Sequence, residues 1–410
     1  MKIIKKQTKP CAIILGGYVN GLGLVRSLGQ AGIPSIVIDS EKNIASYSKY
    51  VCDRFICPNP AEETQAFIEF MIELGKQLPY KGVIFCTDDI WLIPVSKNQM
   101  KLQSYYLYPM SSWKVIERCE DKAQLYDLAN EAEIPHPKTI TLNNIEELER
   151  YEEDIPFPCV LKPSITVGFM ETLGSSGRTL YIETVEELVY WKNRIKNVGL
   201  SYTPLILQEL IPGGAENLYT LTAYSNIDGD ILAYSTGHKI RQNPPDAGTI
   251  VSGRVTPEPE LFLLGQKLIK TAGYYGISNT EFKKDQRDGK FKLIEINPRP
   301  GKWNYSVMAS GINLPYMAYE EVNGKKLPSV GSNEQELVWI SSILDLYLSI
   351  YGYKKKGFSE YSINLWQWLA TIRGGKRVSA IFMLNDLLPG LMDLYSLAQT
   401  AFRRGLFDRR

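Results

Sequence analysis

Two glutamates are expected to face each other across a β-hairpin within residues 278–297. The turn is predicted at residues 287–289, with Gly289 in the left-handed conformation that three-residue hairpin loops favour. This register places Glu281 directly opposite Glu295 on one face of the hairpin. Like charges directly opposite each other destabilise a sheet, so a compensating positive charge is expected beside them. On the core-facing side, the same register pairs Thr280 with Ile296 and Phe282 with Ile294.

A divalent cation is the compensating charge that these residues favour. Asn297 lies two residues beyond Glu295 on the same face. Proteins hold Mg²⁺ by one or two carboxylates together with phosphate oxygens, and Mn²⁺ is an alternative. Arg299 follows along the same strand, where a guanidinium would steady a phosphoryl group during its transfer. A solvent-exposed acidic hairpin with lysines nearby is the competing interpretation.

Upstream segments contain residues that could hold a nucleotide beside such an ion. Residues 160–163 form an apolar strand that contains Lys162, and a Gly/Ser loop at 174–178 leads into a second strand at 179–183. The amides and hydroxyls of such a flap can surround phosphates. A further apolar strand, 205–211, ends in a Pro-Gly-Gly turn, and its edge can present backbone groups to an adenine. Each segment taken singly is also an ordinary hairpin or turn.

A glycine-rich turn near the N-terminus follows one strand and opens a helix. A dinucleotide-binding fingerprint that starts at Gly21 would need a glycine where Arg26 stands, so a plain turn is an equally good interpretation. The amides of this turn, including that of Gly17, could hold a substrate carboxylate. Asp88 and Asp89 follow another strand, at the edge where open α/β sheets bind ligands. We expect them either to contact a substrate or to cap the next helix.

Three units must position these residues. In residues 11–110 short apolar strands alternate with helical patterns, which predicts a doubly wound parallel sheet. A helix over 113–133 opens a second, mixed unit, and the last part of the chain has the periodicity of helices. The predicted fold class is therefore α/β and α+β, with domains at 1–112, 113–325 and 326–410. The strands of the first unit are predicted at 11–15, 35–39 and 82–87, and the helices of the first and last units at 21–31, 61–77, 90–99, 337–353, 363–371 and 386–402.

The composition is that of a soluble globular protein. The 410 residues include 44% hydrophobic and 22% charged residues, and the net charge of +1 argues against nucleic acid as a partner. The charge is uneven, because residues 354–410 hold ten Lys and Arg against four Asp and Glu. The six cysteines form no metal-binding or redox pattern, so we expect free thiols. Neither a signal peptide nor a membrane span is recognisable, and a cytoplasmic location is expected.

The order of these segments resembles that of the ATP-grasp superfamily. The resemblance covers residues 11 to about 325 and implies an N-terminal pre-ATP-grasp domain, an ATP-grasp domain with a lid at about 135–210, and a helical C-terminal extension. It rests on Lys122 at a helix start, Lys162 in Leu-Lys-Pro, the Gly-Ser-Ser-Gly flap, the segment 208–213 and the run Glu-Ile-Asn-Pro-Arg at 295–299. Within the superfamily the chain resembles the carboxylate–amine ligases typified by D-aspartate ligase, through residues 47–50, 134–139, 237–238 and 295–301.

The resemblance implies a role for each group of residues. The phosphates of ATP would be neutralised by Lys122 and Lys162 and covered by Ser175, Ser176 and Gly177. The adenine would lie against Gln208, Glu209 and Ile211, with Glu216 at the ribose. The metal ligands would be Glu281, Glu295 and Asn297. The acceptor carboxylate and the transferred phosphoryl group would be held by Arg299 with Lys239 or Arg241, and His238 beside Lys239 is a candidate substrate contact.

The activity implied is ATP-dependent amide formation. A small-molecule carboxylate would be activated as an acyl phosphate and attacked by an amine, giving an amide, ADP and phosphate, for instance by an amino acid ligase of cell-wall or surface-polymer synthesis. No covalent nucleophile is needed, which agrees with a sequence of two histidines and no convincing catalytic triad. Two alternatives stay open: a carboxylase or carbamoyl-phosphate-type enzyme that activates bicarbonate, and a nucleotide-binding module without turnover at a membrane.

The basic C-terminal segment has two interpretations. As core residues docking on the ATP-binding unit we expect Trp366, Trp368, Leu387, Leu388 and Leu391. Alternatively, the Lys and Arg side chains of 354–410 would contact an anionic membrane surface or an acidic substrate. The sequence does not indicate an oligomeric state.

Overall fold

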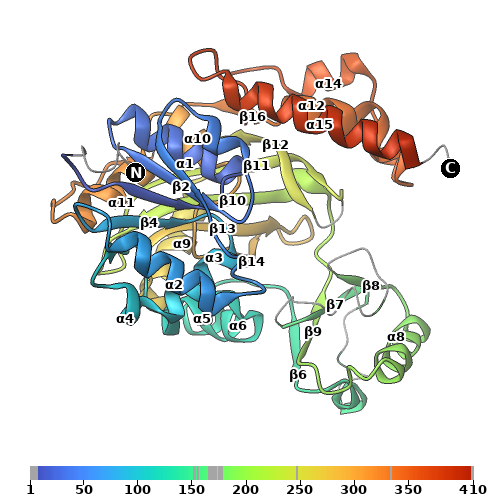
Figure 1. Ribbon diagram of the computed structural model, residues 1–410. Helices are drawn as coiled ribbons and strands as arrows, with labels where there is room; N and C mark the ends of the chain where they lie inside the picture. The colour runs from blue at the N-terminus through green and yellow to red at the C-terminus, as the bar shows by residue number, and fades with distance from the viewer. Residues whose placement is uncertain are drawn as a thin grey trace.

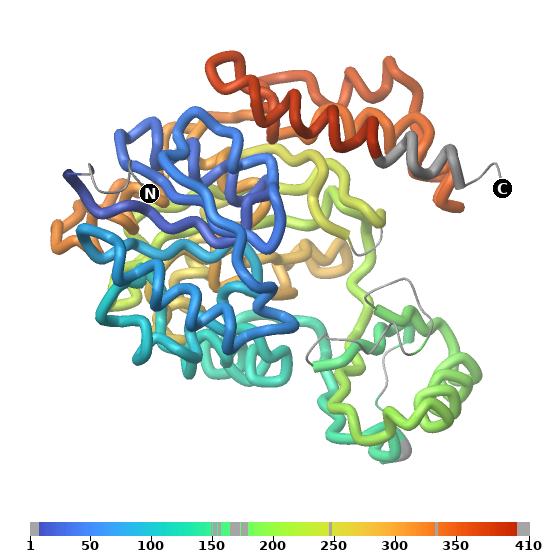
Figure 2. Tube along the Cα trace, viewed as in Figure 1, coloured from blue at the N-terminus to red at the C-terminus, as the bar shows by residue number. Residues whose placement is uncertain are grey.

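The computed structural model describes residues 8–150, 154, 157–164, 173, 179–245, 248–332 and 335–407. It consists of a body built on two sheets, a lid that stands apart on a smaller sheet, and a group of C-terminal helices at one corner of the body (Figure 1). Figure 2 shows the course of the chain through these three parts. This mixed α/β and α+β architecture confirms the predicted fold class.

The N-terminal unit is a five-stranded parallel sheet. Its order is β3 (Val51–Ile56), β2 (Ser35–Asp39), β1 (Ala12–Leu15), β4 (Gly82–Cys86) and β5 (Tyr106–Leu107). Helix α1 (Val19–Gln30) packs on one face, and α2 (Thr64–Gly75), α3 (Asp89–Lys97) and the short α4 (Gln99–Leu102) pack on the other. Its central strands are buried on both faces, as in other parallel sheets. The doubly wound arrangement is confirmed, and β3 and β5 are strands that the sequence analysis did not predict.

An eight-stranded sheet forms the centre of the body. Its order is β14 (Phe291–Asn297), β13 (Gly276–Lys284), β10 (Leu218–Ser225), β11 (Ile231–Asn243), β12 (Thr249–Val255), β16 (Leu337–Ile340) and β17 (Lys376–Ser379), and β15 (Gly331–Ser332) pairs with β11. One face is covered by α5 (Trp113–Glu120), α6 (Lys122–Glu131) and α9 (Pro259–Ala272). The other face packs against α1, α10 (Asn304–Ala309) and α11 (Leu314–Val322). The N-terminal unit and the central sheet therefore share one hydrophobic core.

The turn of the predicted hairpin is longer than expected. The amide of Asp285 donates to the carbonyl of Lys290 over 2.9 Å, so the loop has four residues, 286–289. The amide of Gly289 donates back to the carbonyl of Asp285 over 2.8 Å. Gly289 has a φ of +75°, which confirms the left-handed conformation predicted for it.

A register shift within the hairpin compensates for the longer turn. Phe282 pairs with Leu293 and not with Ile294, so that prediction is wrong. The pairing shifts between Phe282 and Glu281, and beyond this irregularity the predicted register holds. Glu281 pairs with Glu295, and Thr280 pairs with Ile296, as the sequence predicts.

The single helix predicted over 113–133 is two helices. α5 ends at Glu120 and α6 begins at Lys122. Asp121 between them has an extended backbone, and its side chain accepts a hydrogen bond from the amide of Gln124 over 3.0 Å, which caps α6. The break places Glu120 and Lys122 at adjoining helix ends.

The lid is a four-stranded antiparallel sheet with its own hydrophobic core. The order is β6 (Thr139–Leu142), β9 (Leu205–Glu209), β7 (Cys159–Pro163) and β8 (Leu180–Ile182). Helix α8 (Val185–Asn197) and the 3-10 turn η3 (Ile145–Arg150) pack against it. The flap residues Ser175, Ser176 and Gly177 lie outside the described residues.

The C-terminal region is less helical than predicted. Residues 337–340, expected to begin a helix, form strand β16 in the central sheet, and β17 lies beside it. The helical elements are α12 (Ser342–Tyr347), η5 (Leu348–Gly352), α13 (Tyr353–Lys355), η6 (Ser359–Tyr361), α14 (Leu365–Thr371) and α15 (Leu388–Phe407). Of the five residues expected in a core, Trp368 is partly buried, but Trp366, Leu387, Leu388 and Leu391 are exposed. The core prediction is wrong for these four, because their sides of α14 and α15 face solvent.

The cysteines and the question of membrane-spanning helices concern the chain as a whole. All six cysteines are free thiols, as predicted. Five of them are buried, and Cys52 is half-buried. Over the residues that the structure describes, no helix combines the length and the apolar character needed to cross a bilayer.

Candidate active site

One face of the central sheet brings a lysine and two glutamates together. Thr220 on β10 pairs with Glu281 on β13 and with Gly237 on β11, so Glu281 shares its face with Lys239, two residues beyond Gly237. The Nζ atom of Lys239 lies 2.8 Å from Oε2 of Glu281. Glu295 stands directly opposite Glu281 on β14. Lys239 therefore provides a positive charge beside the two facing carboxylates.

The two carboxylates have pKa values shifted in opposite directions. Burial raises the pKa of Glu281, Lys239 opposes this shift, and the charge of Glu295 reinforces it. Burial also acts to raise the pKa of Glu295, but Lys122 and Lys239 outweigh it and hold that pKa below its usual value. The negative charge of the pair therefore depends on cations supplied by other elements of the fold.

The oxygen atoms on this face fit a hard divalent cation that is also bound by phosphates. Asn297 lies beside the pair, with its Nδ2 atom 3.1 Å from Oε1 of Glu295. Two carboxylates and one amide form a donor set suited to Mg²⁺ or Mn²⁺ when phosphate oxygens complete the coordination. Among the described side chains, no group of three or more His, Cys, Asp or Glu is arranged to hold a metal ion. An ion on this face would thus share its ligands with a nucleotide.

Lys162 and Lys122 bring further positive charge toward the same carboxylates. Lys162 on β7 donates from Nζ to Oε1 of Gln208 on β9 over 2.9 Å, and Lys122 begins α6. Burial, assisted by repulsion from Lys122 and opposed by Glu295, lowers the pKa of Lys162 to about 7. An anion placed between two lysines that repel each other would relieve this repulsion, so the arrangement favours phosphate binding.

Glu209 connects the lid to the body. Its Oε2 accepts a hydrogen bond from the amide of Lys138 over 3.0 Å, and its Oε1 forms an ion pair with Arg287 in the hairpin loop. Arg287 also pairs with Asp285, which fixes the loop. The side chain of Glu209 is thus engaged between lid and hairpin, and its amide donates to the carbonyl of Lys138 over 2.8 Å.

The other residues expected at the adenine differ in exposure. Gln208 is buried, and its Nε2 donates to Oγ1 of Thr139 over 2.9 Å. Ile211, just beyond β9, is buried as well. Glu216 lies in the 3-10 turn η4 (Ala215–Asn217), is exposed, and accepts from the amide of Gly214 over 3.2 Å. The buried amide of Gln208 and the buried side chain of Ile211 thus lie at the end of β9, and the exposed carboxylate of Glu216 follows them in the chain.

Arg299, just past the end of β14, reaches across to the N-terminal unit. Its Nη2 atom lies 3.0 Å from Oδ2 of Asp89, and its Nε contacts Oδ1, so the ion pair is bidentate. Asp89 begins α3, and Asp88 caps that helix by accepting from the amide of Asp89 over 2.7 Å. The structure therefore brings Arg299 and Asp89 together and gives Asp88 the capping role that the sequence left open.

The glycine turn of the N-terminal unit holds a carboxylate from the chain itself. The amide of Gly17 donates to Oδ2 of Asp39 over 2.7 Å, and Nδ2 of Asn43 donates to the same oxygen over 3.0 Å. Gly16 has a φ of +91°, and a Cβ there would collide with Oγ1 of Thr87, so this position requires glycine. The anion expected at Gly17 from a substrate is here supplied by Asp39.

Arg241 and His238 lie away from the paired glutamates. Arg241 forms a bidentate ion pair with Asp345 on α12, with distances of 2.7 and 2.6 Å. His238 lies on the opposite face of β11 from Lys239, with its ring 5.5 Å from that of Tyr219. Burial and the charge of Arg254 lower the pKa of His238. The structure therefore separates these two residues from the cluster around Glu281.

Two ionisable residues of this region were not identified from the sequence. Burial and the charge of Asp89 raise the pKa of Glu120 to about 8, against the effect of Arg299. Among the described residues, Oε1 of Glu120 has no hydrogen-bond partner. Burial lowers the pKa of Lys302, three residues beyond Arg299, to about 8. Their nearness to Lys122 and Arg299 in the chain is the one signal that could have identified them.

Comparisons with known proteins match this arrangement. The family model described as "ATP-grasp in the biosynthetic pathway with Ter operon" matches residues 234–342, which include the hairpin and Arg299. The chain is 28% identical over 324 residues to D-aspartate ligase of Enterococcus faecium, covering 75% of this chain and 76% of that protein. It is 24% identical over 222 residues to the C-terminal section of the carbamoyl phosphate synthase large chain of Methanopyrus kandleri, covering 52% of this chain and 39% of that section.

Solved structures share the fold. N5-carboxyaminoimidazole synthetase from Staphylococcus aureus complexed with ADP has a TM-score of 0.64 and 14% identity, covering 96% of this chain and 98% of that one. L-amino acid ligase from Bacillus licheniformis has a TM-score of 0.59 and 15% identity, covering 79% and 76%. The family model, the sequence similarity and the shared fold all point to ATP-grasp proteins: residues 234–342 match an ATP-grasp family model, and the chain is similar in sequence to D-aspartate ligase.

Proposed function

We propose that the chain is an ATP-dependent ligase that activates a small-molecule carboxylate as an acyl phosphate and joins it to an amine. The observation that supports this best is the half-buried pair of Glu281 and Glu295. Glu281 contacts Lys239, and the charges of Lys122 and Lys162 lower the pKa of Glu295. Phosphoryl transfer is catalysed mainly by positioning and by neutralising charge, which needs this concentration of both signs in one place.

The nucleotide would bind between the lid and the central sheet. Its phosphates would meet Lys122, Lys162 and the residues Ser175, Ser176 and Gly177, and its adenosine would meet Gln208, Glu209, Ile211 and Glu216. Glu281, Glu295 and Asn297 would hold Mg²⁺, or Mn²⁺ in its place, whose charge would neutralise the phosphates when bound. Lys239, which contacts Glu281 over 2.8 Å, would then turn toward the transferred phosphoryl group.

The carboxylate substrate would bind at Arg299. The guanidinium is engaged by Asp89 in the bidentate geometry that a substrate carboxylate would use. A substrate that takes this position releases Asp89, whose charge would then attract a protonated amine. Arg241, Asp88, Gly17 and His238 have other partners or face elsewhere, and the proposed site does without them.

The reaction would proceed in two displacements. A carboxylate oxygen attacks the γ-phosphorus of ATP, and the bond to ADP breaks, which leaves an acyl phosphate. The amine nitrogen, after losing a proton, then attacks the acyl carbon, and the carbon–oxygen bond to phosphate breaks. Lys122, Lys162 and Lys239 would hold the ADP and phosphate groups, while Arg299 keeps the acyl group in line.

An amino acid is the carboxylate that the relatives suggest. D-aspartate ligase and L-amino acid ligase are both named for amino acid substrates. We accordingly propose an amino acid ligase that acts in the cytoplasm in the synthesis of a cell wall or surface polymer. Activation of bicarbonate is the second candidate, because the chain also matches a carbamoyl phosphate synthase section and an N5-carboxyaminoimidazole synthetase.

ADP release from ATP separates these candidates. D- and L-amino acids would be screened against a panel of amines, in buffers with and without bicarbonate. We expect ADP to form when one amino acid and one amine are both present, with one ADP per amide and no effect of bicarbonate. ADP that depends on bicarbonate would favour the second candidate. Nucleotide binding without ADP from any combination would contradict both and leave a binding module.

A further inference from the structure

The C-terminal helices leave apolar stripes exposed to solvent. On α15 and the residue before it, Leu387, Leu391, Leu394 and Tyr395 recur at helical spacing and are exposed. Asp393 lies on the other side of α15 and is buried. The first turns of this helix thus meet the body through Pro389, Gly390 and Asp393, while residues 394–399 are exposed on every side and carry the apolar stripe into solvent.

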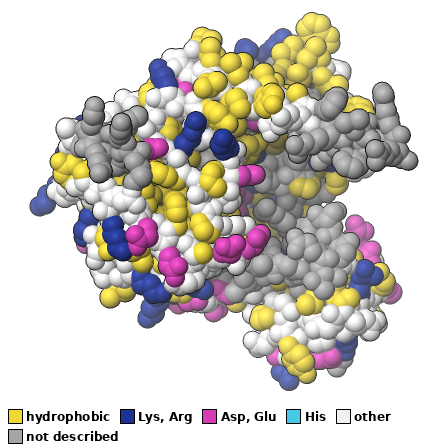
Figure 3. All heavy atoms as spheres, in the orientation of Figure 1, with side chains coloured by type: hydrophobic (Ala, Val, Ile, Leu, Met, Phe, Trp, Pro, Cys, Tyr) yellow, Lys and Arg dark blue, Asp and Glu magenta, His cyan; other side chains and the backbone are white. Residues whose placement is uncertain are grey.

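Neighbouring segments add to this exposed apolar surface. Helix α12 and η5 expose side chains at the same helical spacing, namely Ile343, Tyr347, Ile350 and Tyr351. Trp366 on α14 is 75% exposed, and Leu384 in the loop before α15 is 93% exposed. Figure 1 shows α12, α14 and α15 together at one corner, and Figure 3 shows hydrophobic side chains gathered along the top of the molecule, where these helices lie. We call these residues the C-terminal apolar surface.

The charges of this region are sorted by sign. All six Lys and Arg side chains between 341 and 399 are exposed: Lys354, Lys355, Lys356, Arg373, Lys376 and Arg377. Three of the four carboxylates in the same range are buried: Asp345, Asp386 and Asp393. Glu360 is the exposed one within the described residues. The solvent therefore meets an apolar and cationic surface.

The buried carboxylates anchor this region to the body. Asp386 pairs with Arg26 on α1 over 2.9 Å and accepts hydrogen bonds from Oγ of Ser48 over 2.8 Å and from the amide of Lys49 over 2.9 Å. Asp345 pairs with Arg241 of the central sheet. Asp386 and Asp345 thus hold the C-terminal region on the body. Its apolar side chains are exposed although the region is firmly attached.

We propose that the C-terminal apolar surface binds the face of an anionic lipid bilayer, with its Leu, Tyr and Trp side chains in the headgroup region and its Lys and Arg side chains on the lipid phosphates. Apolar and aromatic residues combined with cations are the composition of helices that lie in a membrane interface. Lysines close to an anionic leaflet each add to the attraction. This inference concerns location and is independent of the reaction proposed above.

A second copy of the chain is a poorer occupant. A two-fold symmetric interface would place this surface against itself, so that exposed lysines such as Lys355, whose Nζ lies 6.0 Å from the ring centroid of Tyr351, would meet their own copies. An anionic bilayer offers an apolar layer and negative charge at once. The charge pattern therefore distinguishes the two occupants.

Co-sedimentation of the full chain with vesicles tests the proposal. We expect binding to phosphatidylcholine vesicles that contain phosphatidylglycerol, weaker binding to phosphatidylcholine alone, and release at high salt. Leu391→Asp should lower the partition coefficient at least about tenfold, because it places a charge in the apolar contact. Leu263→Asp on α9, at a leucine that is 62% exposed, is the matched control and should bind like the wild type.

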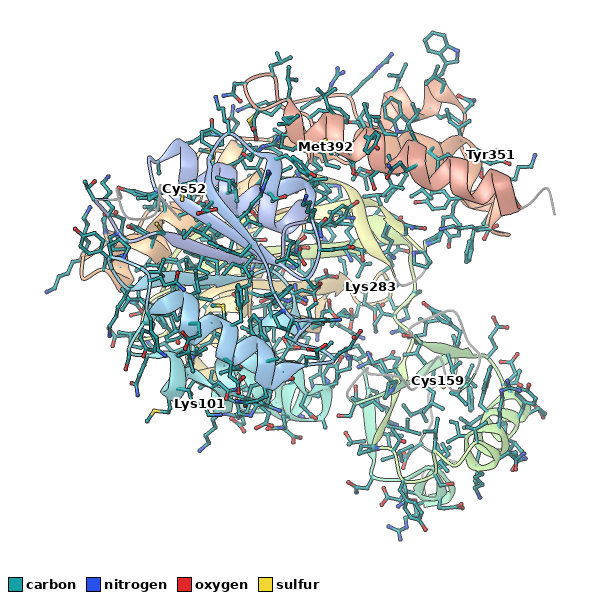
Figure 4. All side chains as sticks on the ribbon, viewed as in Figure 1. Cys52, Lys101, Cys159, Lys283, Tyr351 and Met392 are labelled. Carbon is teal, nitrogen blue, oxygen red and sulfur yellow. The ribbon has the colours of Figure 1, made fainter. Side chains whose placement is uncertain are left out.

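The cationic part has its own matched pair. Lys355→Gln should lower the partition coefficient about fivefold, the effect of one lysine near an anionic surface. Lys101→Gln should have no effect, since Lys101 lies on the opposite side of the molecule from Tyr351 (Figure 4). Equal thermal unfolding midpoints would show that all variants are folded.

Three results would overturn the proposal. The first is a wild-type chain that stays in the supernatant with anionic vesicles. The second is a dimer in sedimentation velocity that Leu391→Asp dissociates, which would assign the surface to a second copy. The third is binding to soluble polyglutamate with the same affinity as to vesicles and no effect of Leu391→Asp, which would assign the lysines to an acidic substrate.

Discussion

Two ion pairs begin on β11 two residues apart, Arg241 with Asp345 and Lys239 with Glu281. Their carboxylates differ greatly in the number of hydrogen-bond donors that surround them. Asp345 accepts hydrogen bonds on both oxygens, from Arg241 twice, from Oγ of Ser252 over 2.9 Å and from Nε1 of Trp368 over 2.6 Å. Glu281 instead meets a single lysine atom, Nζ of Lys239. It also faces the carboxylate of Glu295 across the hairpin.

The difference indicates what each pair is for. Removing a charge from water is costly unless its partners replace all its hydrogen bonds, and the pair of Arg241 and Asp345 meets that condition. The pair of Lys239 and Glu281 does not, because burial and the facing carboxylate of Glu295 raise the pKa of Glu281 in spite of Lys239. Strained charge of this kind marks sites where a ligand completes the balance. From the sequence alone, Lys239 and Arg241 are equally good candidates for binding the transferred phosphoryl group.

Glu295→Gln should have the largest effect on activity of the changes that test this contrast. It keeps the shape of the side chain and removes a charge from the proposed metal site, so ADP formation should fall on the order of a thousandfold, equivalent to several kcal/mol of transition-state stabilisation. The thermal midpoint should fall only slightly, because the attraction to Lys122 and Lys239 that holds the pKa of Glu295 low is lost while the repulsion with Glu281 is relieved. A midpoint that drops sharply would mean that Glu295 belongs to a structural ion pair.

Asp345→Ala should have the opposite profile. It leaves the buried guanidinium of Arg241 without its counter-charge, and the free energy of unfolding should fall by about 3–5 kcal/mol in urea titrations. The exposed Asp228→Ala is the control and should stay within about 0.5 kcal/mol of the wild type. If Asp345→Ala has the same free energy of unfolding as the wild type but forms no ADP, the pair of Arg241 and Asp345 is not structural, and the distinction between the two ion pairs fails.

The sequence predicted correctly that the two glutamates face each other, but it predicted a turn of the wrong length. The alternation around the turn identified the hairpin, and Glu281 does pair with Glu295. The turn has one residue more than expected, and a bulge near Phe282 cancels the resulting shift. A pattern of period two determines which face a residue takes, but it cannot locate a bulge, since a bulge leaves no mark in the alternation.

Long-range partners were beyond the reach of the sequence. Leu337–Ile340 is a short apolar run, which fits a buried strand as well as the start of a helix, and the central sheet decides between them. The same holds for Arg299, whose partner Asp89 is 210 residues away. Exposed leucines on α15 look like core residues in any periodicity argument, because periodicity defines an apolar face without saying what covers it.

The smallest expected effect concerns Lys162, whose charge acts on Glu295. It is tested by the pH dependence of nucleotide binding. Its pKa of about 7 means that the free protein loses this positive charge as the pH rises past neutrality. Phosphates bind the protonated lysine, so binding above pH 7 must take up a proton, and the Kd for ATP should rise up to about tenfold per pH unit. Titration calorimetry across this range measures the slope, and Lys162→Arg should flatten it, because an arginine stays charged. An equal slope in that variant would place the titrating group elsewhere, and a flat wild-type profile would mean that Lys162 does not meet the phosphates.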